Sequence, residues 1–425
     1  MAIPDEAARN ATTCLVVGGG PAGMMLGLLL ARAGIDVTVM EKHADFLRDF
    51  RGDTVHASTL RLLDELGLGD AFATVPHRMI DGVTATVQDT TLRIDLTRLP
   101  GPHKHIALVP QWDFLEMLAG AAQVEPNFRL MRSTEVLGAV RGSGGQERSD
   151  PGSRSGERVT GVRYRAADGA VHEMRADLVV ACDGRASTLR AASGLTPRNF
   201  GAPMDVWWFR VPRHDGDPAG LNGIFQSGHG CALIDRGDYF QVAYLIRKGA
   251  DAAMRAEGIE SLRRQVTELA PWLADRMDTV IAFDDVKLLD VQLNRLRRWY
   301  TDGLLLIGDA AHAMSPIGGV GINLAVADAV AAGRILAEPL RRGSVTTRDL
   351  ARVQARRWLP AALIQRVQRL VQDRAIAVAL DAEGGVGTAP RGIRIAGRIP
   401  VLRALVAYGV AIGPLPEHAP AYARR

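Results

Sequence analysis

The chain has 425 residues, 51 Lys and Arg against 47 Asp and Glu, and a formal net charge of +4. This length accommodates two or three structural units, and a hydrophobic content of 47% is typical of a soluble globular protein. Nearly all the basic charge is arginine scattered along the chain, which argues against a nucleic-acid-binding protein, because such proteins cluster their basic residues. Three widely spaced cysteines, Cys14, Cys182 and Cys231, favour free thiols in a reducing compartment over a disulfide framework or a zinc site, so we expect no metal.

The ends of the chain bear on where the protein works. Residues 1–13 lack the apolar core of a signal peptide, and no run is long enough to span a bilayer, so we expect a cytoplasmic protein. The uncharged run 404–416 could pack on the core, form a dimer contact or touch a membrane surface. The oligomeric state stays open.

The N-terminal region carries a complete nucleotide signature. An apolar strand is expected at 14–17, followed by GGGPAG at 18–23, a helix at 24–33 and a strand at 35–40 that ends in Glu41. In this G-x-G-x-x-G pattern Gly18 permits a tight turn, Gly20 lets the backbone approach a pyrophosphate, and Gly23 lets helix and strand pack closely. Glu41 stands where a carboxylate for ribose hydroxyls is expected, so the region predicts a dinucleotide site.

The middle of the chain alternates between short strands and helices. We expect helices at 58–66 and 112–123, and strands at 83–87, 92–96, 135–140, 159–164 and 178–181. The insert 142–156 is rich in glycine, serine and charged residues and is interpreted as a disordered hairpin tip. Strand 178–181 runs into Asp183 and Gly184, a pair that forms either a plain turn or a second contact with the dinucleotide.

The pattern changes between residues 200 and 295. Longer strands are expected at 206–211, 239–246 and 286–293, and the region contains no nucleotide fingerprint. A sheet of this kind between two nucleotide signatures is well placed to form the wall of a substrate pocket.

A second glycine-rich loop lies late in the chain. It follows the apolar run 304–307, extends from Gly308 to Asn323 and precedes a helical pattern that starts at Leu324. Backbone N–H groups at a helix N-terminus favour negative charge, and Asp309 could accept hydrogen bonds from a polyhydroxy ligand. The remainder is largely helical, with a long pattern at 350–380.

Together, the glycine fingerprint with Glu41, the Cys182-Asp183-Gly184-Arg185 segment with Ser187 and Arg190, and the Gly308-to-Asn323 loop resemble the three signatures of the group A flavoprotein monooxygenases. This is the para-hydroxybenzoate hydroxylase-like and ubiquinone-biosynthesis hydroxylase-like family. The resemblance covers most of residues 12–340 and implies an α/β fold: a doubly wound, Rossmann-like FAD-binding domain of the glutathione-reductase type, an inserted β-sheet substrate domain and C-terminal helices. The implied division is 1–78, 101–197 and 296–345 for the FAD domain, 79–100 and 198–295 for the substrate domain, and 346–425 for the helical region.

The resemblance also implies which residues hold the cofactor. They are Gly18, Gly20, Pro21, Ala22, Gly23, Glu41, Lys42, Arg51, Gln111, Asp183, Gly184, Asp309, Pro316, Gly319, Gly321, Ile322 and Asn323. Pro316 would stand beside the isoalloxazine, and the backbone from Gly321 to Asn323 would point donors at the flavin pyrimidine edge. Two positions depart from the family pattern, since Gln111 replaces a common arginine and Val320 replaces a more polar residue.

The implied function is a monooxygenase in which transient NADPH or NADH reduces FAD, and O2 forms a C4a-hydroperoxyflavin that hydroxylates an aromatic or polyketide/quinone-like small molecule. No catalytic side chain is assigned; His56, His229, Tyr239 and Tyr244 are candidates by position only, and a structural role is the more common explanation for each. His312 either braces the flavin loop or takes part in chemistry.

Three other functions stay open. Residues 207–212, WWFRVP, partly match the W-x-W-x-I-P signature of flavin-dependent halogenases, although the scarcity of lysines leaves no catalytic lysine to assign. The apolar C-terminus weakly suggests an FAD-dependent reductase of a prenyl or quinone-like substrate. A non-enzymatic FAD-binding protein is the third possibility.

Overall fold

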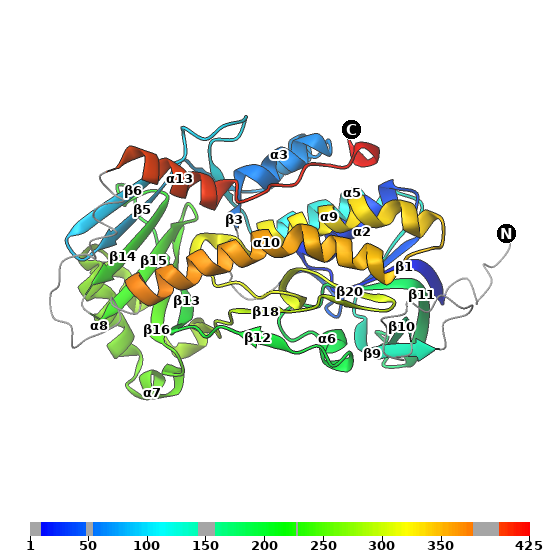
Figure 1. The fold of residues 1–425 in the computed structure, drawn as a ribbon. Coiled ribbons are helices and arrows are strands. Elements are labelled where there is room, and N and C mark those ends of the chain that lie inside the picture. The colour runs from blue at the N-terminus through cyan, green and yellow to red at the C-terminus, as the bar shows by residue number, and fades with distance from the viewer. Residues whose placement is uncertain (1–9, 48–53, 143–157, 227, 377–398) are drawn as a thin grey trace.

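The computed structural model describes residues 10–47, 54–142, 158–226, 228–376 and 399–425. Two large sheets lie beside one another along the length of the molecule, and helix α10 (Thr347–Val371) crosses in front of them (Figure 1). Arg51, positions 143–156 of the expected hairpin tip and positions 377–380 of the long helical pattern lie outside the described residues.

The first sheet is built around five parallel strands in the order β8-β2-β1-β11-β20. Their bounds are β1 Ala11–Val17, β2 Val37–Met40, β8 Phe128–Met131, β11 Val171–Ala181 and β20 Leu304–Leu306. Taken in sequence order this is 3-2-1-4-5, the order of a dinucleotide-binding fold. The antiparallel strand β19 (Tyr300–Thr301) extends the β20 edge. β10 (Arg158–Arg165) pairs with the first half of β11, and β9 (Glu135–Gly142) pairs with β10.

Helices cover one face of this sheet. α2 (Pro21–Arg32), α5 (Gln111–Gln123) and α9 (Gly321–Arg341) share one hydrophobic core with Cys14 and Val16 of β1, whereas Leu15 and Val17 face a second core beneath β9 and β10. Both faces of β1 are therefore buried, which explains its uninterrupted apolar sequence. The helical segment Ile317–Arg341 is long and apolar enough to cross a membrane, but 67% of its apolar window is buried inside the protein, as expected of a core helix.

The second sheet has seven strands in the order β17-β13-β16-β15-β14-β5-β6. Their bounds are β5 Gly82–Val87, β6 Thr90–Asp95, β13 Met204–Pro212, β14 Leu221–Gln226, β15 His229–Asp235, β16 Tyr239–Arg247 and β17 Lys287–Leu289. All neighbours are antiparallel except β14 and β5. One face packs on helix α8 (Ile259–Leu269) and the 3-10 helix η1 (Pro271–Thr279), and the other face looks toward the first sheet.

The expected strand 286–293 is shorter in the structure, where β17 ends at Leu289. The reason is a polar junction around the buried Asp205 carboxylate, which accepts the Val291 N–H at 2.9 Å. Lys248 contacts Asp205 at 2.7 Å and also pairs with Asp290. These contacts draw the chain out of the sheet ladder, and the apolar pattern of the segment does not show them.

Smaller elements connect the two sheets. β3 (Thr54–Val55), β7 (Ile106–Leu108) and β4 (Arg78–Ile80) form one small sheet, and β12 (Pro197–Asn199) pairs with β18 (Asn294–Leu296) in another, which lies along the junction (Figure 1). The remaining helices are α3 Ala57–Glu65, α4 Gly69–Thr74, α6 Thr188–Ala192, α7 Asp251–Ala256 and α13 Pro400–Ala411. β5 and β6 pair within the second sheet although they precede much of the first sheet in sequence. This pairing supports the division into an FAD domain, a substrate domain and a helical region, which we retain as a proposal.

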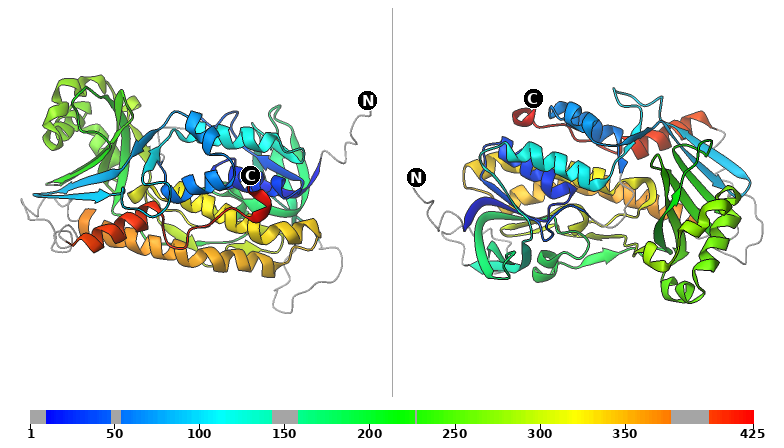
Figure 2. Two further views of the ribbon diagram at one scale, coloured as in Figure 1. Left: turned by 90° about the horizontal axis from the view of Figure 1, so that it is seen from above. Right: turned by 180° about the vertical axis from the view of Figure 1, so that it is seen from behind.

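Helix α13 occupies the uncharged run near the C-terminus and lies against the β5–β6 edge of the second sheet (Figure 2). Ala407 and Ala411 are buried in the core of that sheet. The opposite side of the helix is open, with Val401 74% and Leu405 66% exposed. One side of the run thus packs on the core and the other side is exposed.

Candidate functional site

Four parallel strands of the first sheet end at one edge. Each is followed by a residue singled out in the sequence: Gly18 after β1, Glu41 after β2, Asp183 after β11, and Asp309 after β20. Backbone contacts hold the neighbouring strand ends together, since the Gly18 N–H donates to the Met40 carbonyl at 2.8 Å. In open α/β sheets ligands bind outside the carboxyl ends of the strands, so three motifs far apart in sequence share one ligand-binding edge.

The fingerprint glycines differ in what their backbone permits. Gly18 has φ +102°, and a Cβ there would stand 2.4 Å from the Cys182 carbonyl oxygen. A Cβ on Gly23 would stand 1.9 Å from the Gly18 oxygen, whereas one on Gly20 would meet nothing within 4 Å. Gly18 and Gly23 are therefore required by close backbone packing, and Gly20 leaves the backbone open to a ligand. Pro21 and Ala22 form the first turn of α2, which begins three residues earlier than expected because proline suits that position.

Glu41 is almost fully buried. Its Oε2 accepts the Gly19 N–H at 2.8 Å and its Oε1 accepts the His43 N–H at 3.0 Å. Its carboxylate therefore lies at the ligand edge directly after β2, where an acceptor for ribose hydroxyls is expected. The neighbouring Lys42 is exposed, and Gln111 is the half-buried first residue of α5.

Asp183 has one carboxylate oxygen without a partner. Its Oδ2 accepts the Leu189 N–H at 3.3 Å, but Oδ1 is buried and finds no donor among the described residues. Burial raises the pKa of this carboxyl, against hydrogen bonds from Ser187 and Leu189 that lower it. Gly184 beside it has φ +79° and open space where a Cβ would be. A buried acceptor lacking a donor, at the ligand edge of the sheet, suits a hydroxyl-bearing ligand.

Arginines join the second and third motifs. Arg185 Nε lies 3.2 Å from Asp309 Oδ2, and Arg190 Nη1 donates to the Ala310 carbonyl at 3.0 Å. Asp309 remains about one third exposed. The Asp309 carboxylate is therefore held by Arg185, while part of it stays accessible at the ligand edge.

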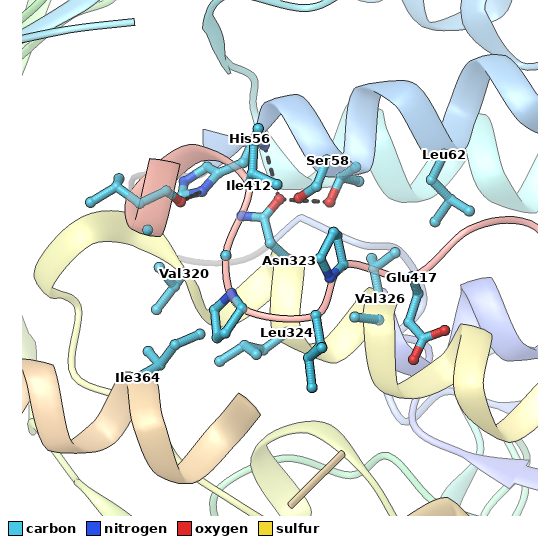
Figure 3. Close-up of a pocket in the computed structure, with 18 of the residues that line it drawn as sticks. His56, Ser58, Leu62, Val320, Asn323, Leu324, Val326, Ile364, Ile412 and Glu417 are labelled. Carbon is cyan, nitrogen blue, oxygen red and sulfur yellow. Dashed lines mark hydrogen bonds between the residues drawn. The ribbon is translucent and has the colours of Figure 1, made fainter. Parts of the chain in front are cut away.

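The last glycine loop is fixed by side chains from β3 and α3. Gly319 has φ +61°, and its carbonyl accepts the Thr54 hydroxyl at 2.7 Å. Asn323 Oδ1 accepts the His56 N–H at 2.9 Å (Figure 3) and the Thr59 hydroxyl at 2.7 Å, while its Nδ2 donates to the Thr54 carbonyl at 3.1 Å. The Asn323 side chain is thus used to hold the loop. Sequence reasoning gave a role only to its backbone.

The backbone at the start of α9 remains available. Within the described part of the chain, the N–H groups of Gly321, Ile322 and Asn323 have no acceptor, as is usual in the first turn of a helix. A Cβ on Gly321 would meet nothing within 4 Å, and Pro316 stands half-buried at the start of the loop. These donors and the helix dipole favour a negatively charged group.

A cavity of about 40 Å³ lies behind this loop, between α3, the start of α9 and residues 409–417 (Figure 3). A volume of this size holds about one water molecule, so it is not a ring-binding site. His56 closes it on one side: its Nδ1 donates to the Val410 carbonyl at 2.7 Å, and its Nε2 lies 3.1 Å from the Thr54 hydroxyl. Burial lowers the pKa of His56 to about 4, against the Val410 contact, so the ring is a neutral brace between α3 and α13.

His312 belongs to a buried charge network. Its Nε2 lies 2.6 Å from Asp328 Oδ2, and Asp328 Oδ1 accepts Arg357 Nε at 2.9 Å, with all three side chains at most 2% exposed. Asp328 also accepts the Gly308 N–H at 3.1 Å, which ties the network to the loop. Between the two explanations for His312, this geometry supports the brace. Sequence reasoning missed Asp328 and Arg357, although a lone carboxylate within the apolar first half of α9 is a usable signal.

The other candidate bases belong to the second sheet. Tyr244 faces α8, where its hydroxyl contacts His229 Nδ1 at 2.7 Å and Gln265 Oε1 at 2.9 Å. Tyr239 begins β16 and lies beneath the Arg210 guanidinium, 4.7 Å from its ring centroid. Tyr244 and His229 thus bond to each other on the face of the sheet that looks away from the flavin loop, and Tyr239 is stacked by an arginine at a strand end.

These features fit FAD. The open backbone at Gly20, the Glu41 carboxylate, the Asp183 Oδ1 and the backbone donors at the start of α9 offer groups suited to pyrophosphate, ribose, ribityl and flavin atoms, respectively. Arg51, which the resemblance also places at the cofactor, lies outside the described residues.

Comparisons with known proteins agree. The model of the FAD binding domain family matches residues 11–366. The 6-methylpretetramide 4-monooxygenase of Streptomyces rimosus is 35% identical over 410 residues, which cover 94% of this chain and 92% of that protein. PqsL of Pseudomonas aeruginosa, solved with 2-aminobenzoylacetate, superposes with TM-score 0.72 at 20% identity and covers 91% of this chain and 100% of its own.

The myxobacterial halogenase CndH also shares the fold, with TM-score 0.69 at 18% identity over 94% of this chain and 97% of its own. At that identity the likeness shows the fold alone. The match of the family model and the full-length relative confirm the resemblance read from the three motifs. The chain therefore belongs to the FAD binding domain family and is an FAD-dependent oxidoreductase of the monooxygenase type.

Proposed function

We propose that the protein takes electrons from NADH or NADPH and inserts one oxygen atom of O2 into an aromatic small molecule of the polyketide or quinone-like type. The observation that carries this proposal is the convergence of three motifs on one sheet edge, beside a second sheet with its own apolar face. The substrate class is supported by the 6-methylpretetramide 4-monooxygenase, whose sequence aligns along nearly all of this chain.

The balance of the reaction is simple. One NAD(P)H, one proton, one O2 and the substrate give NAD(P)+, the hydroxylated product and one water. When bound, FAD supplies the hydride acceptor and the oxygen activation, and the protein binds, orients and excludes water.

The chain's own groups account for the protein's share. The N–H groups of residues 321–323 would stabilise negative charge that develops at the edge of the flavin ring, as an oxyanion hole does. Their positions are set by the Asn323 side chain and by Thr54, both fixed before a ligand arrives. Such preorganised donors need no rearrangement during the reaction.

A halogenase is less well supported. In the partial signature at 207–212, Trp207 and Phe209 both lie in the core formed with α8, on the face that looks away from the flavin loop. Lys248 is held by Asp205 and Asp290 at the junction of the sheets.

Three free cysteines, two buried and Cys182 half-buried, favour a reducing compartment and hence a cytoplasmic location.

The test is anaerobic reduction of the purified holoenzyme by NADH and by NADPH, with a panel of phenols, quinols and polycyclic aromatics, followed by turnover in ¹⁸O2. Flavin bleaching and one ¹⁸O atom in the product support the proposal. A product that gains two hydrogens without ¹⁸O indicates the reductase. Turnover only with a separate flavin reductase and a halide indicates the halogenase, and no nucleotide oxidation with any ligand indicates a non-enzymatic protein.

A further inference from the structure

A row of residues that face one another crosses the second sheet on the face that looks toward the flavin loop. It begins at Trp208 of β13 and continues with three small residues: Ala243 of β16, Ala232 of β15 and Gly223 of β14. Ile317, from the glycine loop at the start of α9, packs on the same hydrophobic cluster. The row therefore faces the expected position of the flavin.

The middle of this row consists of the two smallest side chains, Ala243 and Ala232. Residues that lie directly opposite each other on adjacent strands point to the same face of a sheet. Ala243 and Ala232 are such a pair, so their side chains are neighbours separated by one strand spacing, about 4.8 Å. The Phe225 ring covers Gly223: a Cβ on that glycine would lie 2.9 Å from a ring carbon. Two alanines thus lie between the large aromatic side chains Trp208 and Phe225.

The indole nitrogen of Trp208 is buried without a partner in the part of the chain that the structure describes. The side chain is 7% exposed, and its Nε1 finds no acceptor among the described residues. The other fully buried tryptophans do have acceptors, since Trp207 donates to Asp251 at 2.6 Å and Trp299 donates to the Leu296 carbonyl at 3.2 Å. Buried indole N–H groups normally find a partner, and an unpaired one is costly.

A second unpaired donor lies on the same face. Gln241 is two residues from Ala243 on β16 and is 2% exposed; its Oε1 accepts Arg236 Nε at 2.9 Å, but its Nε2 has no acceptor in the described residues. Trp208 and Gln241 are diagonal neighbours across the strand pair, about 7–8 Å apart. A ligand with oxygen atoms along one edge would satisfy both.

We propose that Trp208 is a specificity-determining residue: its indole N–H donates to a carbonyl or phenolate oxygen of a planar, fused-ring aromatic substrate that lies over Ala243 and Ala232. This inference rests on the proposed function and names the substrate class of the same site. The row from Trp208 to Gly223 spans three strand spacings, about 14 Å, which is more than a single ring covers, whereas a fused-ring plane covers it and brings an oxygen to the indole.

The test measures dissociation constants of the oxidised holoenzyme by equilibrium dialysis, without nucleotide. The probes are anthraquinone-2-sulfonate, anthracene-2-sulfonate, which has the same rings without the carbonyls, and 4-hydroxybenzoate. The variants are Trp208→Phe, which removes the donor but keeps a ring, Ala232→Leu, which fills the row, and Trp207→Phe, a control on the opposite face of the same strand.

We expect Trp208→Phe to weaken binding of the anthraquinone about three- to tenfold and to leave the anthracene unchanged, because one hydrogen bond is lost. Ala232→Leu should weaken both fused-ring probes about tenfold or more and spare 4-hydroxybenzoate, because the added side chain occupies the row. Trp207→Phe should leave all the ratios unchanged. Retained flavin absorbance and melting temperature show that each variant is folded.

The inference is overturned if Trp208→Phe does not change the preference for the anthraquinone over the anthracene, if Trp207→Phe causes the same loss, or if the wild type binds neither fused-ring probe. The proposed function is tested by a separate measurement. If the binding pattern holds but neither nucleotide bleaches the flavin, the substrate site is supported and the monooxygenase activity is contradicted. If a nucleotide bleaches the flavin but the binding pattern fails, only the role of Trp208 is contradicted.

Discussion

The edge of the first sheet and the inner face of the second sheet are built in different ways. The first is specified by backbone: positive φ angles, glycines at van der Waals contact and N–H groups at strand and helix ends. The second is specified by side chains whose neighbours depend on strand register, as Trp208 and Ala243 do. A cofactor common to many proteins is held by a short, recognisable pattern, whereas a particular substrate is selected by contacts that leave no motif.

The comparison predicts that breaking a buried support of the first sheet's edge is the most damaging change. Asp328→Asn removes the charge between His312 and Arg357 and leaves the buried guanidinium with only its longer contact to Glu417, at 3.7 Å. We expect a loss of about 3 kcal/mol in the free energy of unfolding, at the lower end for a broken buried ion pair because Glu417 remains, together with weaker FAD retention. Urea denaturation measures it.

The matched control is Glu135→Gln, which breaks the pair with Arg165, where both side chains are about half exposed. That pair should contribute no more than about 1 kcal/mol. Equal losses in the two variants would show that the buried network does not support the site.

The fingerprint glycines should separate into two kinds. Gly23→Ala places a Cβ against the Gly18 oxygen and should cost about 3 kcal/mol of stability. Gly20→Ala meets no protein atom, so it should fold normally and lose affinity for FAD alone. Thermal unfolding of the apoprotein and FAD titration distinguish the two effects. Gly120→Ala, on the exposed side of α5 with open space around it, is the control and should be neutral or slightly stabilising.

Acid should lower the free energy of unfolding through His56, which braces the loop at the cofactor edge. Its pKa is lowered to about 4 by burial, from an unfolded value of 6.5, so the unfolded chain binds the proton more readily. Stability is therefore full above about pH 6.5 and declines as the pH falls toward 4, by up to about 3 kcal/mol.

Burial also lowers the pKa values of His105 and His229, so the measurement compares the pH dependence of unfolding in the wild type and in His56→Gln. The variant should lose part of the slope between pH 6.5 and 4. An unchanged slope would mean that His56 does not contribute.

The smallest expected effect is on the outer face of the second sheet. Tyr244→Phe removes a hydroxyl that contacts His229 and Gln265 and should cost about 1 kcal/mol of stability. Because that face looks away from the flavin loop, kcat and its pH profile should not change. A shifted pH profile would return Tyr244 to the candidates for the base.

The sequence by itself determined the fold class and the family, because nucleotide motifs are local: the run from Gly18 to Gly23 begins a helix directly after a strand, and each motif carries its own turn chemistry. It also located most strands of the first sheet, which are uninterrupted apolar segments buried on both faces. The expected end of the strand at 293 was wrong, since the contacts of Asp205 with Val291 and Lys248 come from distant segments.

The tertiary structure decided everything that depends on long-range pairing. It joined His312 to Asp328 and Arg357, used the Asn323 side chain to hold the loop, and placed Tyr244 in the core with α8 and Trp208 in the core on which the glycine loop packs. The physical reason is that adjacent residues of a strand point to opposite faces, and only the packing of helix α8 on one face reveals which tryptophan faces the glycine loop.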